Sequence, residues 1–231
     1  MIKNRFLIIP LALFACVIPN NAIQHLSEFN FTSASVLPVF SRGNALYLIV
    51  AREIEGKSRG LYDDFGGGRE KNEHHPVVTA AREFFEEAIL SLTIGLSLRE
   101  VQNYIDTYNT KYIICHTKNE RSKSVTYITQ FNRYYKELLR NFYTARNKVK
   151  EAAYREKDHI AVIKWNQLEK TIARTRKIKK TTITAWVIDP LTGNWNKKRI
   201  KLRASFVRKF KPFFLGRSYE KEWDQRIRFY D

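Results

Sequence analysis

Short apolar runs bounded by polar residues or glycine predict strands along the chain. The first two, Ala34–Phe40 and Ala45–Arg52, are joined by Arg42-Gly43-Asn44, a sequence that suits a tight turn. We therefore predict a β-hairpin at the start of the folded domain. Three later runs are also predicted to be strands: Lys111–His116, Ser124–Phe131 and His159–Trp165.

Apolar residues at helical spacing predict helices in the same region. One runs from Val77 to Leu90 after Pro76, whose missing N–H is no loss in a first helical turn. Another is expected to start at Asn166, a fair N-cap, and to end at Ala173. Two more are predicted: Ser97–Tyr108, with Leu98, Val101 and Ile105 inward, and Arg133–Tyr154, with Leu138, Leu139, Phe142, Ala145 and Val149 at helical spacing. The basic outer face of Arg133–Tyr154 is either a solvated surface or a wall that selects substrate.

The C-terminal part of the chain is strongly basic. Thr181–Ile188 and Asn194–Leu202 predict a second hairpin around the turn residues between them. A helical stretch follows in which basic and aromatic residues interleave: Phe206, Arg208, Lys209, Phe210, Lys211, Phe213 and Phe214. This composition suits phosphate contacts with base stacking, an anionic membrane surface, or a packed extension with solvated charges. All three interpretations stay open at this point.

Composition limits how large a core the chain can form and indicates that the protein attracts anions. The chain has 231 residues and 44% hydrophobic content, enough for one core with an extension. Lys and Arg number 41 against 23 Asp and Glu, which gives a formal net charge of +18. Such a field attracts nucleotides, nucleic acid or acidic lipid surfaces.

Residues 1–22 resemble a targeting segment. Lys3 and Arg5 precede an apolar run from Phe6 to Ile18, which has the length of a signal-peptide core and is short for a membrane span. Leu13-Phe14-Ala15-Cys16 resembles a bacterial lipoprotein box. We therefore expect an exported protein that is periplasmic, secreted or lipid-anchored. If the leader is instead a packed N-terminal helix or reflects a wrongly chosen start codon, a cytoplasmic protein is expected.

The candidate functional residues lie in a predicted glycine-rich turn and the acidic helix that follows it. Gly66-Gly67-Gly68 lets the backbone approach a partner without a Cβ in the way. On the helix that follows, Glu83, Glu86 and Glu87 lie three and four residues apart, so their like charges repel on one face. A hard divalent cation relieves this repulsion, because Mg²⁺ prefers carboxylate and phosphate oxygens. From the residues alone, the sequence predicts a divalent metal and a phosphate.

These residues resemble the Nudix box, whose pattern is Gly, five residues, Glu, seven residues, Arg-Glu-apolar-any-Glu-Glu-any-Gly-apolar. Gly67, Glu73 and Arg82-Glu83-Phe84-Phe85-Glu86-Glu87 supply the pattern, and Leu90 fills its last apolar position. The interval from Glu73 to Arg82 is one residue longer than usual, and strict spacing would pair Gly68 with His74 instead. Ile89 replaces the closing glycine, so we expect the helix to continue past its usual end.

The resemblance implies an α+β fold, a Nudix-type α/β/α sandwich with a mixed sheet, to which the basic hairpin and helix are added. It implies three segments: a leader at 1–22, a Nudix hydrolase domain at 30–175 and a basic extension at 176–231. The order of two strands, a glycine loop and a helix is similar to the opening of that domain. Asp63 and Asp64 precede the glycines and either contact metal-bound water or cap the loop.

The same resemblance implies a site and a cofactor. Glu83, Glu86 and Glu87 would hold Mg²⁺ or Mn²⁺, and the Gly67 carbonyl would add a ligand. Arg82 would orient a helix glutamate, whereas Glu73 would hold either the metal or the loop. In this family an acid outside the box often completes the site, and by position Glu156 comes first here and Asp158 second.

The implied activity is metal-dependent hydrolysis of the diphosphate linkage in a nucleoside diphosphate joined to another group. A nucleotide-type small molecule is therefore the expected substrate, and the basic C-terminal region is a candidate for binding RNA or an anionic surface. The alternatives are a catalytically degenerate Nudix fold that binds nucleotide or RNA, for which the lengthened box argues, and a basic binding protein in which the box is incidental.

Overall fold

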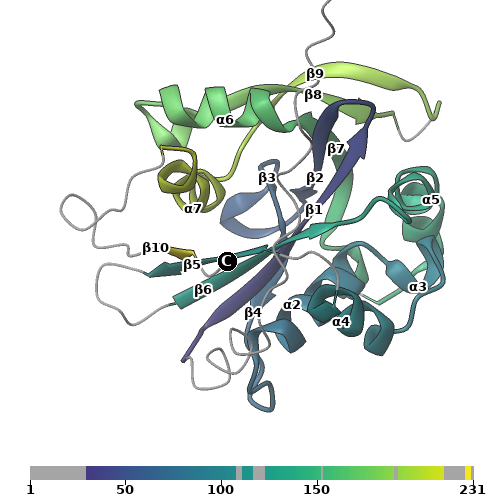
Figure 1. The fold of residues 1–231 in the computed structure, drawn as a ribbon. Helices are drawn as coiled ribbons and strands as arrows, with labels where there is room; N and C mark the ends of the chain where they lie inside the picture. Colours follow the sequence, from purple (N-terminus) through teal and green to yellow (C-terminus); the bar gives the residue numbers. More distant parts are fainter. Residues whose placement is uncertain are drawn as a thin grey trace, which may run out of the picture.

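The fold is given by a computed structural model that describes residues 30–107, 111–116, 123–151, 153–189, 192–215 and 227–229. A mixed sheet runs through the middle of these residues, and helices cover both of its faces (Figure 1). The strands are β1 Ser33–Arg42, β2 Ala45–Glu53, β3 Tyr62–Asp63, β4 Phe65–Gly68, β5 Lys111–His116, β6 Lys123–Gln130, β7 Lys157–Lys164, β8 Thr182–Ile188, β9 Trp195–Lys201 and β10 Ile227–Phe229. The helices are α2 Pro76–Glu87, α3 Leu90–Thr93, α4 Leu98–Thr107, α5 Tyr135–Lys148, α6 Trp165–Arg174 and α7 Ala204–Leu215.

The main strand order is β10-β5-β6-β1-β2-β7-β8-β9. β1 and β6 are parallel, and the other pairings are antiparallel, which makes the sheet mixed. The predicted class, α+β with a mixed sheet between helical layers and an added C-terminal hairpin and helix, is confirmed.

The sheet divides between β1 and β2. The two strands pair only from Val39 to Arg42, where they form the predicted hairpin. At its other end β1 pairs with β4 through residues 33–36, whereas β2 pairs with β3 through Ala51 and Arg52. The short segment that joins β3 to β4 therefore lies where the two halves of the sheet separate. This split is where the polar network described below is buried.

Each face of the sheet has its own core. On one face α2, α4 and α5 pack around Phe65, Phe84, Phe131 and Phe142. On the other face α6 and α7 pack over alternate residues of the same strands, with Phe206 and Phe210 fully buried. The basic C-terminal stretch thus extends the sheet by β8 and β9 and covers one of its faces with α7.

The predicted strands and both hairpins are confirmed, with boundary shifts of one or two residues. The prediction that Gly66-Gly67-Gly68 forms a turn was wrong, because these residues belong to β4 and pair with β1. Three details of the helices were wrong. The helix predicted over Arg133–Tyr154 ends at Lys148, because Val149 is extended and the chain turns back to begin β7. Leu98 is 39% exposed rather than inward, and Asn166 lies inside α6, whose N-cap is Lys164.

The expectation that the box helix continues past Ile89 was also wrong. α2 ends at Glu87, and Ile89 adopts the left-handed conformation at φ 55°. Among the described residues it is the only non-glycine with positive φ. Such a backbone costs a β-branched residue about 1–2 kcal/mol. The Ile89 side chain is fully buried, and this burial offsets the strain.

The predicted leader, residues 1–22, lies outside the described residues. Within the described ranges, no helix is long and apolar enough to cross a membrane.

Candidate carboxylate site

Gly67 lets the backbone of β4 approach the Glu83 side chain closely. A Cβ placed on Gly67 would lie 2.5 Å from Glu83 Oε1 and 2.6 Å from its Cδ. The Glu83 carboxylate on α2 therefore occupies the space that a side chain on β4 would need. Gly68, the next residue, has open space at the same position. The glycine that matches the box pattern is thus the one whose lack of a side chain accommodates a box glutamate.

Arg82 connects the loop to the helix. Its Nε donates to Glu73 Oε1 at 2.8 Å, and its Nη1 donates to Glu86 Oε2 at 3.3 Å. Its Nη2 lies 2.9 Å from Glu83 Oε1 and donates to the Gly68 carbonyl at 2.9 Å. The ion pair predicted between Arg82 and a helix glutamate is present, and it is one part of a larger cluster.

Glu73 keeps its place despite the extra residue before Arg82. Its Oε2 accepts from Thr79 Oγ1 at 2.6 Å and from the Glu70 N–H at 2.8 Å, and Arg82 binds Oε1. Burial alone would raise the pKa of Glu73, but the hydrogen bonds from Arg82 and Thr79 lower it. Both oxygens hold protein groups, so these contacts are those of a loop anchor. His74, the alternative under strict spacing, is exposed.

Glu83 and Glu86 carry poorly compensated negative charge. Burial raises the pKa of Glu83 to about 7, and Arg82 only partly opposes this rise. Burial also raises the pKa of Glu86 against the same arginine. Glu156, which is exposed, adds to both shifts by repulsion. The outside acid predicted from chain position thus lies within electrostatic range of two box glutamates.

Glu87 has a different environment from the other two. It is 2% exposed, its Oε2 accepts from the Gly66 N–H at 2.7 Å, and its Oε1 lies 3.2 Å from Lys157 Nζ. Burial raises its pKa well above the ordinary value, and Lys157 opposes the rise. In the described part of the chain, no group of three or more His, Cys, Asp or Glu side chains is arranged to hold a metal ion. The three box glutamates therefore do not converge in this structure as one ligand set.

Two of the three glutamates nevertheless suit Mg²⁺. This ion is usually bound by one or two carboxylates and completes its shell with water and substrate phosphate. Glu83 and Glu86 offer carboxylates with raised pKa values that a cation would stabilise in the ionised form. Glu87 does not fit this role in the present arrangement, since protein groups engage both of its oxygens.

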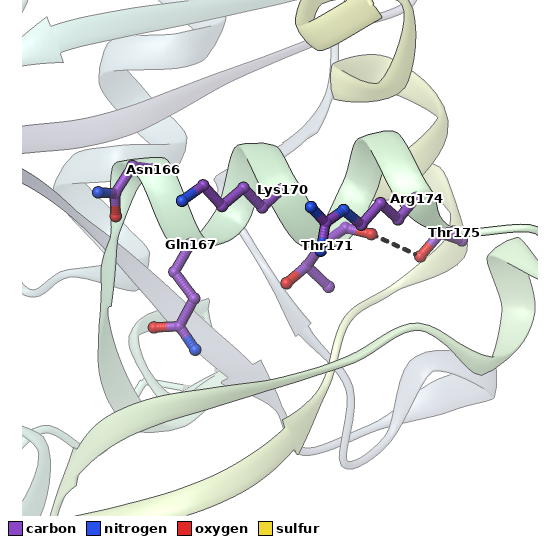
Figure 2. A pocket seen from close by; sticks show the side chains of 6 residues that line it. All are labelled: Asn166, Gln167, Lys170, Thr171, Arg174 and Thr175. Atoms are coloured by element: carbon purple, nitrogen blue, oxygen red, sulfur yellow. Dashed lines mark hydrogen bonds between the residues drawn. The ribbon is translucent and has the colours of Figure 1, made fainter.

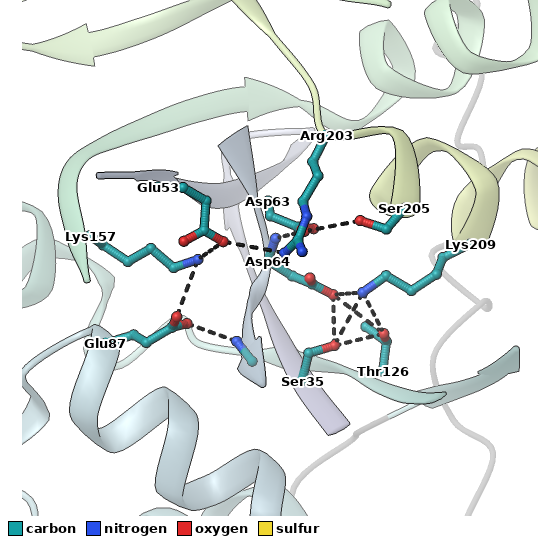
Figure 3. A network of polar contacts seen from close by, with 11 residues as sticks. Ser35, Glu53, Asp63, Asp64, Glu87, Thr126, Lys157, Arg203, Ser205 and Lys209 are labelled. Atoms are coloured by element: carbon teal, nitrogen blue, oxygen red, sulfur yellow. Dashed lines mark hydrogen bonds and ion pairs between the residues drawn. The ribbon is translucent and has the colours of Figure 1, made fainter. Parts of the chain in front are cut away.

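A chain of ion pairs, anchored by the buried Lys157, lies in the split of the sheet (Figure 3). Lys157, at the start of β7, is 1% exposed and lies between Glu53 at 2.7 Å and Glu87 at 3.2 Å. Arg203 continues the chain, because its Nη1 lies 3.3 Å from Glu53 Oε1 and 3.0 Å from Asp63 Oδ2.

Lys209 of α7 reaches the same split from the other side (Figure 3). Its Nζ donates to Asp64 Oδ2 at 2.5 Å and to Thr126 Oγ1 at 3.2 Å. Ser35 Oγ also donates to Asp64 Oδ2, at 2.7 Å. Asp64 is therefore neutralised by a lysine of the chain itself rather than placed at an open metal site.

The pKa values of Asp63 and Asp64 shift in opposite directions because their partners differ. Burial, together with repulsion from the neighbouring Asp64 charge, raises the pKa of Asp63 to about 7. Burial would also raise the pKa of Asp64, but Lys209 and its hydrogen bonds lower it to about 2. Both acids are buried, at 4% and 3% exposed, and the Asp63 carboxylate accepts the Asp64 N–H at 3.0 Å.

Lys209→Met is expected to destabilise the fold by about 3 kcal/mol or more at pH 7, because it leaves Asp64 buried without its cation. Asp64 has a depressed pKa, so in the wild type its stabilisation is present above its unfolded pKa and is lost as pH falls towards 2. The difference in the free energy of unfolding between the wild type and Lys209→Met should therefore shrink as the pH falls. Urea unfolding from pH 7 to pH 3 measures it. Arg208→Met, at an exposed neighbouring position, is the control, and a difference independent of pH would contradict the prediction.

Asp158, the second outside acid considered, is already paired. Arg52 Nε and Nη2 donate to its two oxygens at 2.8 and 2.7 Å, and His159 Nδ1 lies 3.1 Å from Oδ1. Burial would raise the pKa of Asp158, but these partners lower it. Of the two acids, Glu156 is the one that the structure brings near Glu83 and Glu86.

Sequence reasoning missed the cations of the network and one of its acids. Glu53, Lys157 and Arg203 were not singled out, and Lys209 was named only as one of the basic residues of a helical stretch, without its partner Asp64. A usable signal was the pair of acids at 63 and 64 between Tyr62 and Phe65, which are apolar strand residues. Two acids in a buried strand region require cationic partners. The sequence alone does not say which of its many basic residues supply them.

No family model matches this chain, and no curated protein matches it in sequence. A MutT/nudix family protein from Enterococcus faecalis is similar to it in structure at 11% identity and TM-score 0.39, over 81% of this chain and 68% of the other. A C. elegans Ap4A hydrolase has 14% identity and TM-score 0.38, over 81% and 100% of the two chains. The NUDIX domain of Shewanella oneidensis NrtR has 11% identity and TM-score 0.31, over 47% and 70%. All three likenesses are distant in sequence and in superposition.

Proposed function

We propose that this protein is a Nudix-type hydrolase that cleaves the diphosphate linkage of a nucleoside diphosphate joined to another group. The observation that carries the proposal is the contact between Gly67 and the Glu83 carboxylate, beside Arg82 and Glu86. It brings together the residues that give the sequence its resemblance to the Nudix box. The net charge of +18 suits a polyanionic substrate.

The residues of the cluster then divide the tasks of metal binding, positioning and proton transfer. Glu83 and Glu86 would hold Mg²⁺ or Mn²⁺, which neutralises the diphosphate and lowers the pKa of the attacking water. Arg82 keeps both carboxylates in place and is itself held by Glu73. The proton of the water would pass to Glu83 or to Glu156, the two acids whose environments leave them available.

A second candidate is a protein of the same fold that binds nucleotide without hydrolysing it. The observation in its favour is the buried ion pair between Lys157 and Glu87, which engages the third box glutamate. This candidate predicts nucleotide binding that does not depend on Glu83 or Glu86.

The two candidates are separated by assaying the full chain with a panel of diphosphate-containing nucleotides and Mg²⁺ or Mn²⁺. For the hydrolase we expect at least one substrate to be cleaved, and Glu83→Gln and Glu86→Gln to lower kcat by about 100-fold or more. Glu156→Gln tests the outside acid, and a comparable fall would make it the proton acceptor. Chromatography of the products measures turnover and identifies the bond that breaks.

Glu169→Gln is the matched control, because it makes the same change at an exposed position on α6. It should retain full turnover, and all variants should unfold at the wild-type temperature. Turnover that survives both box substitutions would contradict the proposed site. Nucleotide binding without turnover of any substrate would support the second candidate.

A further inference from the structure

A groove lies on the sheet face that carries α5, between this helix and the β8–β9 hairpin. It has a volume of about 1030 Å³. Its floor includes Phe40, Tyr47 and Ile188, and its rim includes Trp186 and Trp195. Figure 1 shows the hairpin and α5 at the same end of the sheet. No residue of the carboxylate site lines it.

Its walls present aromatic rings to solvent. Trp186 is 42% exposed and Trp195 is 39% exposed. Only two other large hydrophobic side chains in the described ranges are comparably exposed, so the two tryptophans form a local concentration. Tyr135 and Tyr143 of α5 line the opposite wall. Aromatic rings on both walls can stack on planar groups that enter between them.

The same groove is rimmed by cations. Arg42, Lys136 and Arg140 line it and are exposed, and among the described residues none of them has an ion-pair partner. Lys197 of β9 lies over the Trp186 ring, 4.9 Å from its centroid. Asp189 is the only acid in the lining. The ligand that complements this surface therefore carries several negative charges and several flat rings.

The groove is separate from the carboxylate site. Phe40 and Arg42, at the C-terminal end of β1, line the groove. The carboxylate site lies near the N-terminal end of β1, where Ser35 pairs with Gly66. Seven residues of extended strand between Ser35 and Arg42 span about 23 Å. One small molecule does not reach both places, but a polymer can.

We propose that this groove binds single-stranded nucleic acid. Bases stack on Trp186 and Trp195, and the phosphates contact the cations of β1 and α5. Proteins that bind single strands without sequence preference combine a basic groove with aromatic side chains in this way. A duplex hides its base faces, so it offers the phosphates but not the stacking partners.

A second hollow provides a comparison within the same molecule. It runs along α6 and is lined by Asn166, Gln167, Lys170, Thr171, Arg174 and Thr175 (Figure 2). It carries two basic residues but no aromatic ring. Since it offers charge without stacking, it serves as a control surface.

The test is fluorescence anisotropy of the full chain with a labelled single-stranded oligonucleotide of about 12 nucleotides, over a series of salt concentrations. We expect Trp186→Ala/Trp195→Ala to weaken binding by about tenfold or more, because each stacked base contributes strongly to affinity. Trp186→Phe/Trp195→Phe should bind much more tightly than the double alanine variant, because it keeps an aromatic ring at both positions. Lys136→Gln/Arg140→Gln should lower the slope of log affinity against log salt by about 0.7 for each phosphate that the protein no longer neutralises.

Lys170→Gln/Arg174→Gln removes the same charge from α6 and should change binding little. If it weakens binding as much as the change at 136 and 140, nonspecific attraction to a basic protein explains the binding and the proposal is wrong. Equal affinity for duplex of the same length would also overturn it. So would tryptophan-dependent binding to anionic phospholipid vesicles with no binding to the oligonucleotide. Unchanged unfolding temperatures of all variants confirm that the differences arise at the surface.

Discussion

Lys157→Met is expected to destabilise the protein by about 3–5 kcal/mol, because it removes the cation from two carboxylates in the split of the sheet. Glu53 lies 2.7 Å from the Lys157 amine, and Glu87 lies 3.2 Å from it. Burial works against the charge of Lys157, yet the two carboxylates raise its pKa above the ordinary value. Without the lysine, Glu87 must take up a proton or remain buried as an unpaired anion. Chemical unfolding at neutral pH measures the loss.

The control for this substitution lies on the same strand. Lys164, at the other end of β7, is exposed, so Lys164→Met should change the free energy of unfolding by less than about 0.5 kcal/mol. Adding Glu87→Gln to Lys157→Met should recover part of the loss, because the double variant no longer buries that charge. Equal losses at 157 and 164, or no recovery in the double variant, would show that the ion pairs do not account for the stability.

The second large effect is expected from alanine substitutions in the glycine strand β4, which should separate folding from activity. At Gly66 a Cβ would lie 2.2 Å from Ser35 Cβ and 2.5 Å from the Ala34 carbonyl, so Gly66→Ala should destabilise the sheet by about 3 kcal/mol. At Gly67 the clash is with the Glu83 carboxylate, the end of a flexible side chain that can move aside. Gly67→Ala should therefore fold while losing about 100-fold in activity, since displacing a reacting group by about 1 Å has that effect.

Gly68→Ala provides the matched control, because a Cβ there meets no atom within 4 Å and the residue lacks positive φ. Its activity and stability should remain close to those of the wild type. Unfolding measurements and turnover of the same substrate on all three variants test the series. Full activity in Gly67→Ala would show that Glu83 is not used in the position that the structure gives it.

The parts of the candidate site that were predictable are local in sequence. Gly67 lies on β4, Glu73 in the loop that follows, and Arg82 and Glu83 on the next helix, so their contacts follow from short spacings and helical periodicity. The extra residue between Glu73 and Arg82 suggested a displaced acid. The loop absorbs it instead, because Glu73 still reaches Thr79 and Arg82.

The partners of Glu87 and Asp64 were not predictable in the same way. Lys157 lies 70 residues beyond Glu87, and Lys209 lies 145 residues beyond Asp64. The chain has 41 lysines and arginines, and local pattern does not single out Lys157 and Lys209 among them. The groove was missed for the same reason, since its aromatic and basic residues come from β1, β2, α5, β8 and β9.

The sequence by itself determined the longer strands and helices, both hairpins and the order of glycines and acidic helix in the carboxylate site, but not the short elements β3, β4, β10 and α3. Turn chemistry, apolar periodicity and helical spacing depend on residues that are close together in the sequence, so the sequence alone reveals them. The tertiary structure decided that Glu87, Asp63 and Asp64 face cations of the chain itself and that the tryptophans of β8 and β9 face α5. The reason is that the sheet divides between β1 and β2 and brings distant strands together, and buried charges must then find partners among the residues that this topology supplies.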